Sequence, residues 1–306
     1  MKPLDYHKVF ETLIEKTREY LVNNRIHSMI LGISGGIDST IVAAICSEVN
    51  KRTGIPLIGR SLPTKHNKPN EKTAAEWVGK AFCNNFGTFQ ITDIYHDVRD
   101  IIIEDPSKQT AIANGNIQAR LRMIYLYNLA SIYKGIVFST DNATEYNLGF
   151  WTLHGDVGDF NPLFGLWKSE IFELARWLVE FYTLRSNLNS NSALINEELA
   201  KVSALTLSLS LVPTDGLGIT SSDLEQIGGK SYEEVDFILQ EILSWKKTTG
   251  IENISAKEQK ELFLSQQKIL NTDIDTVRKV ADRHFASEFK RKNLPIVIPR
   301  DNYQLP

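Results

Sequence analysis

The sequence Met29-Ile-Leu-Gly-Ile-Ser-Gly-Gly-Ile-Asp-Ser39 decides the fold of this chain. Its first five residues form a short apolar run, which predicts a buried strand over 29–33. A serine and two glycines follow at 34–36, and apolar residues return at helical spacing over 39–49. A buried strand that passes through a glycine-rich turn into a helix is typical of α/β proteins. We therefore place residues 34–39 at the carboxyl end of a strand in a parallel sheet.

The rest of the first half alternates in the same way. Apolar periodicity predicts an amphipathic helix over 4–22 and helices over 71–82 and 116–133, with further strands over 55–59, 89–94 and 136–138. This alternation predicts an α/β fold, a doubly wound parallel sheet with helices on both faces. Ligands bind beyond the carboxyl ends of such strands, so the polar residues 34–39 and 139–145 mark the expected site.

The second half is less regular. Residues 149–165 have the composition of a loop, and a helix is expected over 168–181. The segment 183–211 is rich in Asn, Ser and Leu and receives no assignment, whereas the remainder reads as helical up to a basic tail at 290–295. No repeat or linker interrupts the chain. We expect one domain over 1–306, with an N-terminal helix within 1–25, an insertion-like segment at 183–211 and a helical C-terminal extension.

Composition narrows the functional class. The 306 residues are 42% hydrophobic and 23% charged, which is ordinary for a globular protein, and the net charge of −3 argues against a nucleic-acid partner. Cys46 and Cys83 are too few for a disulfide framework, which favours a reducing compartment. The N-terminus is charged throughout and no apolar run approaches about 18 residues, so neither a secretory signal nor a membrane span is expected. We expect a soluble, cytoplasmic protein with no membrane partner.

The residues 32–39 have the chemistry of an anion cradle. Gly35 and Gly36 can adopt positive φ and let phosphate oxygens approach the backbone, while Ser34 and Ser39 add hydroxyl donors. Asp38 beside a polyphosphate implies a divalent cation between them. A plain turn with Asp38 and Ser39 as helix caps is the alternative. The loop is not a Walker A motif, and the Gly-Lys-Ser at 229–231 has no strand before it, so we predict a helix end and a new start there.

The string Ser34-Gly-Gly-Ile-Asp-Ser39 resembles the PP-loop of the N-type ATP pyrophosphatases, which cleave ATP between its α- and β-phosphates. Further strings resemble the NAD synthetases of that family and occur in the same order. They are Gly115–Met123, Ser139–Glu145, Gly155-Asp156, Pro162-Leu163 with Lys168, Pro213–Gly216 and Phe289–Arg291. The resemblance spans roughly residues 10–300 and implies an adenine nucleotide alpha hydrolase-like fold.

The resemblance also implies a ligase reaction, the last step of NAD biosynthesis. ATP adenylates the carboxylate of deamido-NAD and releases pyrophosphate, and ammonia then converts the acyl-adenylate into NAD and AMP. Asp38 and Glu145 would hold Mg²⁺, Lys168 would stabilise the departing pyrophosphate, and Asp156 would guide or deprotonate ammonia. The ATP site implied by the family comprises Gly32, Ile33, Ser34, Gly35, Gly36, Ile37, Asp38, Ser39, Thr140, Lys168 and Thr214.

For deamido-NAD, the family pattern implies Arg120, Leu153, Asp159, Phe289 and Lys290. Leu153 stands where many members have lysine and Phe289 where they have histidine, so dinucleotide recognition is where we expect a difference. Family members are homodimers whose dinucleotide site borders the interface, and the apolar face of the first helix suits such packing. Several of these residues also have ordinary structural interpretations: Glu145 as a helix cap, Lys168 as a solvated lysine and Arg120 in a surface ion pair.

Ammonia is the expected nitrogen source. About 28 residues precede the first strand, fewer than a glutaminase domain needs, and neither cysteine fits its nucleophile. A separate glutamine amidotransferase subunit remains open. Two alternatives to NAD synthesis are another PP-loop ATP pyrophosphatase that adenylates a different acceptor, such as a tRNA base, and a regulator that binds ATP without turnover.

Overall fold

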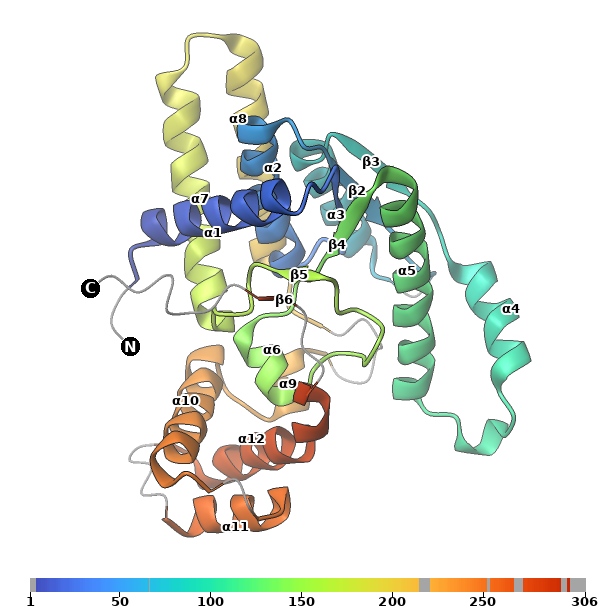
Figure 1. Cartoon of the computed structure of the whole chain (residues 1–306), viewed down its shortest axis with the longest axis vertical. Coiled ribbons are helices and arrows are strands. Elements are labelled where there is room, and N and C mark those ends of the chain that lie inside the picture. Colours follow the sequence, from blue (N-terminus) through green and yellow to red (C-terminus); the bar gives the residue numbers. More distant parts are fainter. Residues whose placement is uncertain are drawn as a thin grey trace.

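The computed structural model describes residues 4–65, 67–214, 221–251, 254–266, 272–292 and 296–297. A parallel sheet with the strand order β3-β2-β1-β4-β5-β6 lies at the centre (Figure 1). Because the chain winds outward from β1 in both directions, the sheet is doubly wound, as predicted. The strands are β1 (Ser28–Gly32), β2 (Leu57–Ser61), β3 (Asn85–Thr88), β4 (Gly135–Phe138), β5 (Phe160–Asn161) and β6 (Ile296–Val297).

Both faces of β1 are covered by helices. Met29 and Leu31 belong to a cluster formed with α1 (Tyr6–Asn23), α2 (Ile37–Thr53) and α3 (Pro69–Phe82). Ile30 points to the opposite face, where it joins residues of α5 (Ala111–Tyr133). Side chains alternate between the faces of a strand, so a strand that is apolar at every position is buried on both sides.

The strand predicted over 89–94 is wrong. β3 ends at Thr88, and α4 (Thr92–Ile102) begins within the predicted span. The buried residues Ile91 and Tyr95 are four positions apart, which is helical spacing, whereas the true strand contributes only partly exposed side chains at an outer position of the sheet. An edge strand with so little apolar content lacks the period-two signal on which strand prediction rests.

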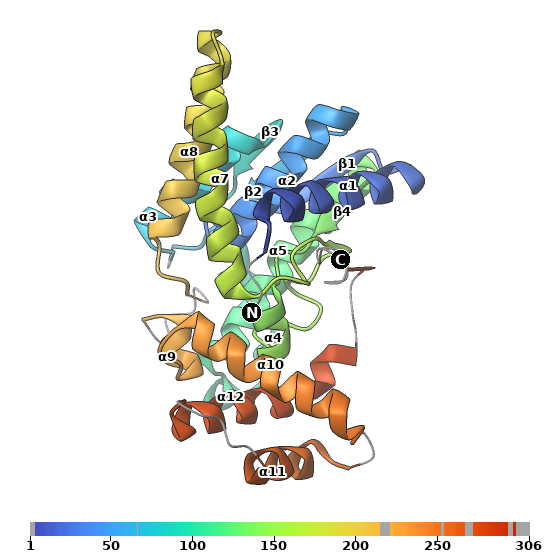
Figure 2. The ribbon, with the colours of Figure 1, turned by 90° about the vertical axis from the view of Figure 1, so that its left-hand side faces the viewer.

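The unassigned segment 183–211 proves to be helical. α7 (Lys168–Leu188) extends seven residues beyond its predicted end, and α8 (Ser192–Ser210) returns beside it as a hairpin that projects from the sheet (Figure 2). The hydroxyls of Thr183 and Ser186 bond back to carbonyls within α7, so these polar residues do not end the helix. Asn191 then caps α8 by accepting from the N–H groups of its first turn.

The C-terminal extension is helical, as predicted. α6 (Ala143–Leu148) packs against α10 and α12 in a further core cluster that lies below the sheet in Figure 1. Gly228 ends α9 with a φ of +83°, and Ser231 caps α10, so Gly229–Ser231 is the predicted helix junction. No helix of the described residues is long and apolar enough to cross a bilayer. These elements are α9 (Asp223–Ile227), α10 (Tyr232–Thr249), α11 (Ala256–Gln266), α12 (Ile274–Ala286) and the short 3-10 helices Pro106–Lys108 and Glu288–Lys292.

Candidate functional site

The glycine-rich loop connects β1 to α2 at the carboxyl end of β1. Gly35 has a φ of +87°, and a Cβ at this position would lie 2.6 Å from the carbonyl oxygen of Glu71 and 2.7 Å from the nitrogen of Ala75. Glycine is therefore required both for the backbone conformation and for the approach of α3. Gly36 instead has a φ of −70° and is the N-cap residue of α2, so the positive φ that we expected at this second glycine is wrong.

Hydroxyl groups hold the loop in shape. The Oγ atoms of Ser34 and Ser39 lie 3.0 Å apart, and Ser39 and Thr40 both donate to the carbonyl oxygen of Gly36. α2 begins at Ile37, two residues before its predicted start, so its first N–H groups lie within the loop. A helix N-terminus carries a partial positive charge, and this one opens toward the cavity described below.

Lys168 joins two carboxylates beneath this loop. Its Nζ lies 2.5 Å from Oδ2 of Asp38 and 2.9 Å from Oε1 of Glu145, and its side chain is only 3% exposed. The solvated-lysine interpretation is therefore wrong. Burial lowers the pKa of Lys168, but the two carboxylates outweigh burial and raise it well above its ordinary value. Lys168 is positively charged at neutral pH.

Glu145 has two structural roles at once. Oε2 accepts from the backbone N–H of Asn142, and the Asn142 side chain accepts from the N–H of Glu145, which forms a capping box at the start of α6. The other oxygen, Oε1, contacts Lys168. Burial and the neighbouring Asp38 raise the pKa of Glu145 to about 7, while Lys168 opposes them.

The residues present fit a divalent cation bound together with a nucleotide. Oxygens of Asp38 and Glu145, from α2 and α6, converge on one Nζ and so define a single cation position. Mg²⁺ is commonly held by one or two carboxylates, with phosphate oxygens and water completing six ligands. Within the described ranges, no group of three or more His, Cys, Asp or Glu side chains forms a cation site. Phosphate oxygens would have to supply the remaining ligands.

A cavity of about 350 Å³ opens at the carboxyl ends of β1, β2 and β4, and its size is that of a small-molecule site. Of the predicted ATP-site residues, all but Gly35 and Ser39 line it. Asp156 and Glu145 are also on its wall. The residues that the structure brings together here are Gly32, Ile33, Ser34, Gly36, Ile37, Asp38, Thr140, Glu145, Asp156, Lys168 and Thr214.

Two arginines of the cavity wall were missed by the sequence analysis: Arg60, which is buried, and Arg122, which is half-buried. Arg60, the last residue but one of β2, donates to the carbonyl oxygens of Gly59 and Asn85, but its buried Nε makes no hydrogen bond within the described part of the chain. Arg122, on α5, donates from Nε to the carbonyl oxygen of Leu62 at 3.0 Å. The rule that ligands bind beyond strand ends could have identified Arg60, because it directly follows the strand predicted over 55–59.

Asp156 lies on the cavity wall, surrounded by many protein atoms although its side chain stays open to the cavity. Its Oδ1 accepts from the N–H of Thr152 at 2.7 Å, and burial raises its pKa, with Lys290 and Arg122 acting in the opposite direction. The neighbouring Asp141 has a pKa raised well above its ordinary value, first by burial and then by the charge of Asp156. A carboxylate with a raised pKa binds protons more readily than one in water.

The five predicted dinucleotide residues do not line this cavity. Arg120 is exposed on α5 and donates to the carbonyl oxygen of Leu153 at 3.1 Å. Both carboxylate oxygens of Asp159 are engaged inside the chain, one by the hydroxyl of Tyr127 and one by the N–H of Val137. A substrate-binding role for Arg120, Leu153 and Asp159 stays a prediction.

The C-terminal pair, Phe289 and Lys290, lies against the loop that follows α6. Lys290 donates to the carbonyl oxygens of Gly149 and Trp151, at 2.7 and 2.5 Å, and its Nζ lies 5.4 Å from the centre of the Trp151 ring. Phe289 is 62% exposed. Lys290 holds this loop in the present arrangement, and the predicted role of both residues in dinucleotide binding is untested.

Neither cysteine is an activated nucleophile. Cys46 is fully buried in α2, and Cys83 follows α3. Burial raises the pKa of Cys46 well above its ordinary value and that of Cys83 to about 12. Both side chains are therefore thiols at neutral pH, consistent with the prediction that neither is a nucleophile.

A doubly wound parallel sheet with a glycine-rich loop at a helix N-terminus and a buried lysine–carboxylate group is typical of nucleotide-binding α/β proteins. The NAD synthase family model matches residues 9–294, so the chain belongs to the NAD synthase family. An NH3-dependent NAD(+) synthetase of Campylobacter jejuni is 33% identical over 178 residues, which cover 57% of this chain and 69% of that protein. One from Thermoplasma volcanium is 30% identical over 239 residues, 78% of this chain and 85% of that protein. Like its family, the chain is a ligase.

The fold is shared with solved structures. The structure of an NMN synthetase from Francisella tularensis superposes with a TM-score of 0.71, covering 95% of this chain and 98% of that chain. The sequence identity is 24%, so this likeness shows the fold alone.

Proposed function

We propose that this chain is an ammonia-dependent NAD synthetase that adenylates deamido-NAD with ATP and then amidates it, releasing pyrophosphate and AMP. The observation that carries the proposal is Lys168, buried and charged between Asp38 and Glu145 at the wall of a cavity that begins with the glycine-rich loop. Membership of the NAD synthase family supports the reaction class. That residues 1–306 act as one domain remains part of this proposal.

In the first half-reaction, the acceptor carboxylate attacks the α-phosphorus of ATP and the bond to the β-phosphate oxygen breaks. The loop N–H groups and the start of α2 would bind the pyrophosphate end. Mg²⁺ bound by Asp38 and Glu145 would neutralise phosphate charge. With Mg²⁺ on the two carboxylates, the ammonium group of Lys168 would pair with phosphate oxygens instead, where it would stabilise the negative charge that develops on the leaving pyrophosphate.

In the second half-reaction, ammonia attacks the carbonyl carbon of the acyl-adenylate and the bond to AMP breaks. The attacking nitrogen must lose a proton. Asp156 lines the cavity and has a raised pKa, so its carboxylate is suited to accept that proton. The predicted nitrogen source is free ammonia, and a cytoplasmic location remains our expectation from the two reduced thiols.

We also propose a homodimer, but through a different face from the one expected. The apolar face of α1, including Val9, Phe10 and Leu13, is buried in this chain's own core and cannot form the dimer interface. α5 instead leaves Ile124 exposed one turn from Arg120. Packing of this face on a second copy would bury the isoleucines and bring Arg120 to the interface. The exposed isoleucines of α4 and α5 are Ile94, Ile101, Ile102, Ile112, Ile124 and Ile132.

The dimer is tested by sedimentation equilibrium. Ile124→Asp should yield monomers, whereas Val22→Asp, at an exposed valine of α1, should leave the dimer intact. A monomeric wild-type chain, or an Ile124→Asp variant that remains dimeric, would overturn this part of the proposal.

A smaller acceptor than the dinucleotide is the second candidate. In that case the mononucleotide carboxylic acid, rather than deamido-NAD, would be amidated. Leu153 and Phe289 favour this alternative, because they remove two basic side chains that the family pattern offers to the dinucleotide. The two acceptors undergo the same chemistry at the carboxylate.

The test is pyrophosphate release from Mg·ATP by the purified chain, with each acceptor, ammonium and glutamine added separately and together. We expect release that requires deamido-NAD, and NAD that forms only with ammonium. A preference for the mononucleotide would establish the second candidate. Binding of ATP without pyrophosphate release under any acceptor would instead support the non-catalytic regulator, and activity with glutamine equal to that with ammonium would overturn the nitrogen source.

A further inference from the structure

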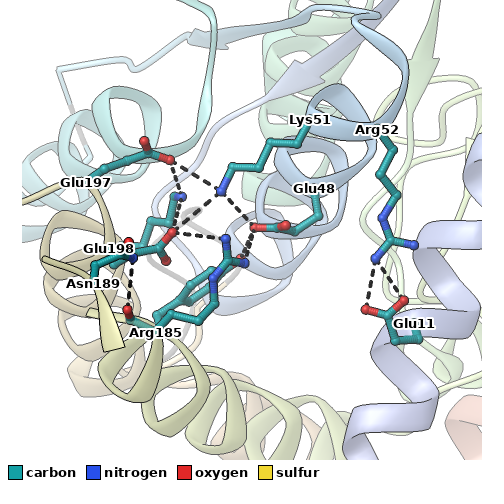
Figure 3. A network of polar contacts seen from close by, with 10 residues as sticks. Glu11, Glu48, Lys51, Arg52, Arg185, Asn189, Glu197 and Glu198 are labelled. Carbon is teal, nitrogen blue, oxygen red and sulfur yellow. Dashed lines mark hydrogen bonds and ion pairs between the residues drawn. The ribbon is translucent and has the colours of Figure 1, made fainter. Parts of the chain in front are cut away.

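A cluster of charged side chains, of which Glu48, Glu198 and Lys201 are buried, joins the α7–α8 hairpin to α2 (Figure 3). We call it the hairpin cluster. Lys201 is 1% exposed and Glu198 is 4% exposed, and three acidic side chains balance three basic ones. The members are Glu48 and Lys51 of α2, Arg185 of α7, and Glu197, Glu198 and Lys201 of α8.

The contacts cross between the three helices. Arg185 lies 3.1 Å from Glu48 and 3.3 Å from Glu198, so α7 is joined to both α2 and α8. Lys51 of α2 lies 3.4 Å from Glu197 and 3.6 Å from Glu198, and Lys201 lies 2.6 Å from Glu197. Glu198 therefore keeps its partners on α2 and α7 only while α8 holds its present position. The ion pairs of Lys201 lie within α8, but its Nζ also lies 5.3 Å from the centre of the Tyr182 ring of α7.

Stability alone does not account for such a cluster. Replacing a buried ion group by apolar residues is often neutral or stabilising, whereas removing one member leaves a costly unpaired charge. The best-attested role of a buried ion cluster is to specify one register of a helix among several that apolar packing would allow. The rest of the buried face of α8 consists of Ala204, Leu205 and Ser208, small or flexible side chains that do not define a register by themselves.

The register of α8 bears directly on the cavity. Ser208 lies two turns beyond Lys201 on the same face, and its hydroxyl is 2.9 Å from that of Thr40, next to the glycine-rich loop. α8 ends at Ser210, and the next four residues, 211–214, form part of the cavity wall. The carbonyl oxygen of Pro213 then accepts from the N–H of Asp223, which fixes the far end of the segment. A slip of α8 by one turn would displace the wall by about 5.4 Å.

We infer that the hairpin cluster sets the register of α8 on α2 and thereby positions residues 211–214 as a wall of the nucleotide cavity. Glu198 and Lys201 are positioning residues: they do not line the cavity, and they act through Ser208 and the segment after it. The identity of the nucleotide as ATP rests on the proposed function. The α7–α8 hairpin, to which the sequence analysis assigned no role, thus has one in positioning the cavity wall.

Three variants test the inference. Lys201→Met leaves an unpaired negative charge in the cluster, and Glu198→Gln/Lys201→Met removes one charge of each sign with nearly unchanged shape. Arg52→Met is the matched control, because Arg52 neighbours Lys51 on α2 but pairs with Glu11 of α1 at 2.8 Å (Figure 3). Thermal unfolding, the KM for ATP, the KM for deamido-NAD, and hydrogen–deuterium exchange of residues 206–214 are measured for each.

Lys201→Met should lower the melting temperature and raise the KM for ATP about fivefold or more, with the KM for deamido-NAD unchanged. The double variant should recover the melting temperature while its KM for ATP stays raised and residues 206–214 exchange faster than in the wild type. Arg52→Met should change neither the melting temperature nor the KM for ATP. A merely stabilising cluster predicts instead that KM and melting temperature recover together, and that result would overturn the inference.

The exchange measurement needs no activity. If the wild-type chain releases no pyrophosphate, the proposed function fails, but exchange over 206–214 still decides whether the cluster positions this segment. Unchanged exchange in both cluster variants would overturn the positioning role by itself.

Discussion

Replacing Lys168 by methionine would remove the ammonium group that separates Asp38 from Glu145. The side chain is 3% exposed and its contacts are 2.5 and 2.9 Å, which places the pair among buried ion pairs. Removing one partner of such a pair lowers the free energy of unfolding by about 3–5 kcal/mol. For Lys168→Met at pH 8 we expect a loss of about 3 kcal/mol, the lower end of that range. Loss of transition-state stabilisation should also lower kcat about 10²–10³-fold.

The stability loss should depend on pH in a defined direction. The pKa of Glu145 is already raised to about 7 from its ordinary 4.5, and Lys168 lowers it, so the variant's Glu145 pKa is higher still. The folded state then binds a proton more tightly than the unfolded state, and stability falls as pH rises through the folded pKa. The deficit of Lys168→Met against the wild type should therefore be smaller at pH 6 than at pH 8.

Urea unfolding of both proteins at the two pH values measures this effect. Excess Mg²⁺ should restore part of the stability at pH 8, because a ligand that binds only the folded state stabilises it. Lys72→Met, at another lysine of the cavity wall, is the control and should show no such pH dependence. Equal stability of Lys168→Met and the wild type, or a deficit that grows toward low pH, would refute the reasoning.

Three further predictions concern single residues. Gly35→Ala should destabilise the fold by at least about 2 kcal/mol and abolish ATP binding in calorimetry, because the new Cβ would meet the carbonyl oxygen of Glu71. Gly54 has a similar φ but open space around it, so Gly54→Ala should destabilise the fold less. Asp156→Asn should lower amide formation with ammonium about 10²-fold or more while pyrophosphate release persists, and a full rate would exclude a role as base. Burial raises the pKa of Asp236 to about 6 from its ordinary 3.8, so folded-state stability should fall by about 2 kcal/mol as pH rises from 4 to 7. Asp236→Asn should lose that dependence in urea unfolding, and a variant that keeps it would contradict this assignment.

Local patterns predicted the strands β1, β2 and β4, but they missed β3, β5 and β6, where the signal is tertiary. The strand expected over 89–94 is wrong because β3 is partly exposed and the apolar residues 91 and 95 belong to a helix. The hairpin of α7 and α8 was not predicted because its buried face includes charged residues, Glu198 and Lys201, which read as solvent-exposed in a sequence. Their burial becomes acceptable only when Glu48, Lys51 and Arg185 lie opposite them.

The sequence by itself determined the glycine-rich loop, the α/β order around it and the family, because these depend on residues that are neighbours in the chain. Only the tertiary structure decided that Lys168, 130 residues from Asp38 and 23 from Glu145, holds both carboxylates, and that Arg60 and Arg122 share their cavity while Arg120 faces outward. The carboxyl ends of parallel strands lie at one edge of the sheet, and the sequence pattern predicts this. Packing between elements decides which side chains converge there and how far burial shifts their pKa values, and sequence spacing does not encode that packing.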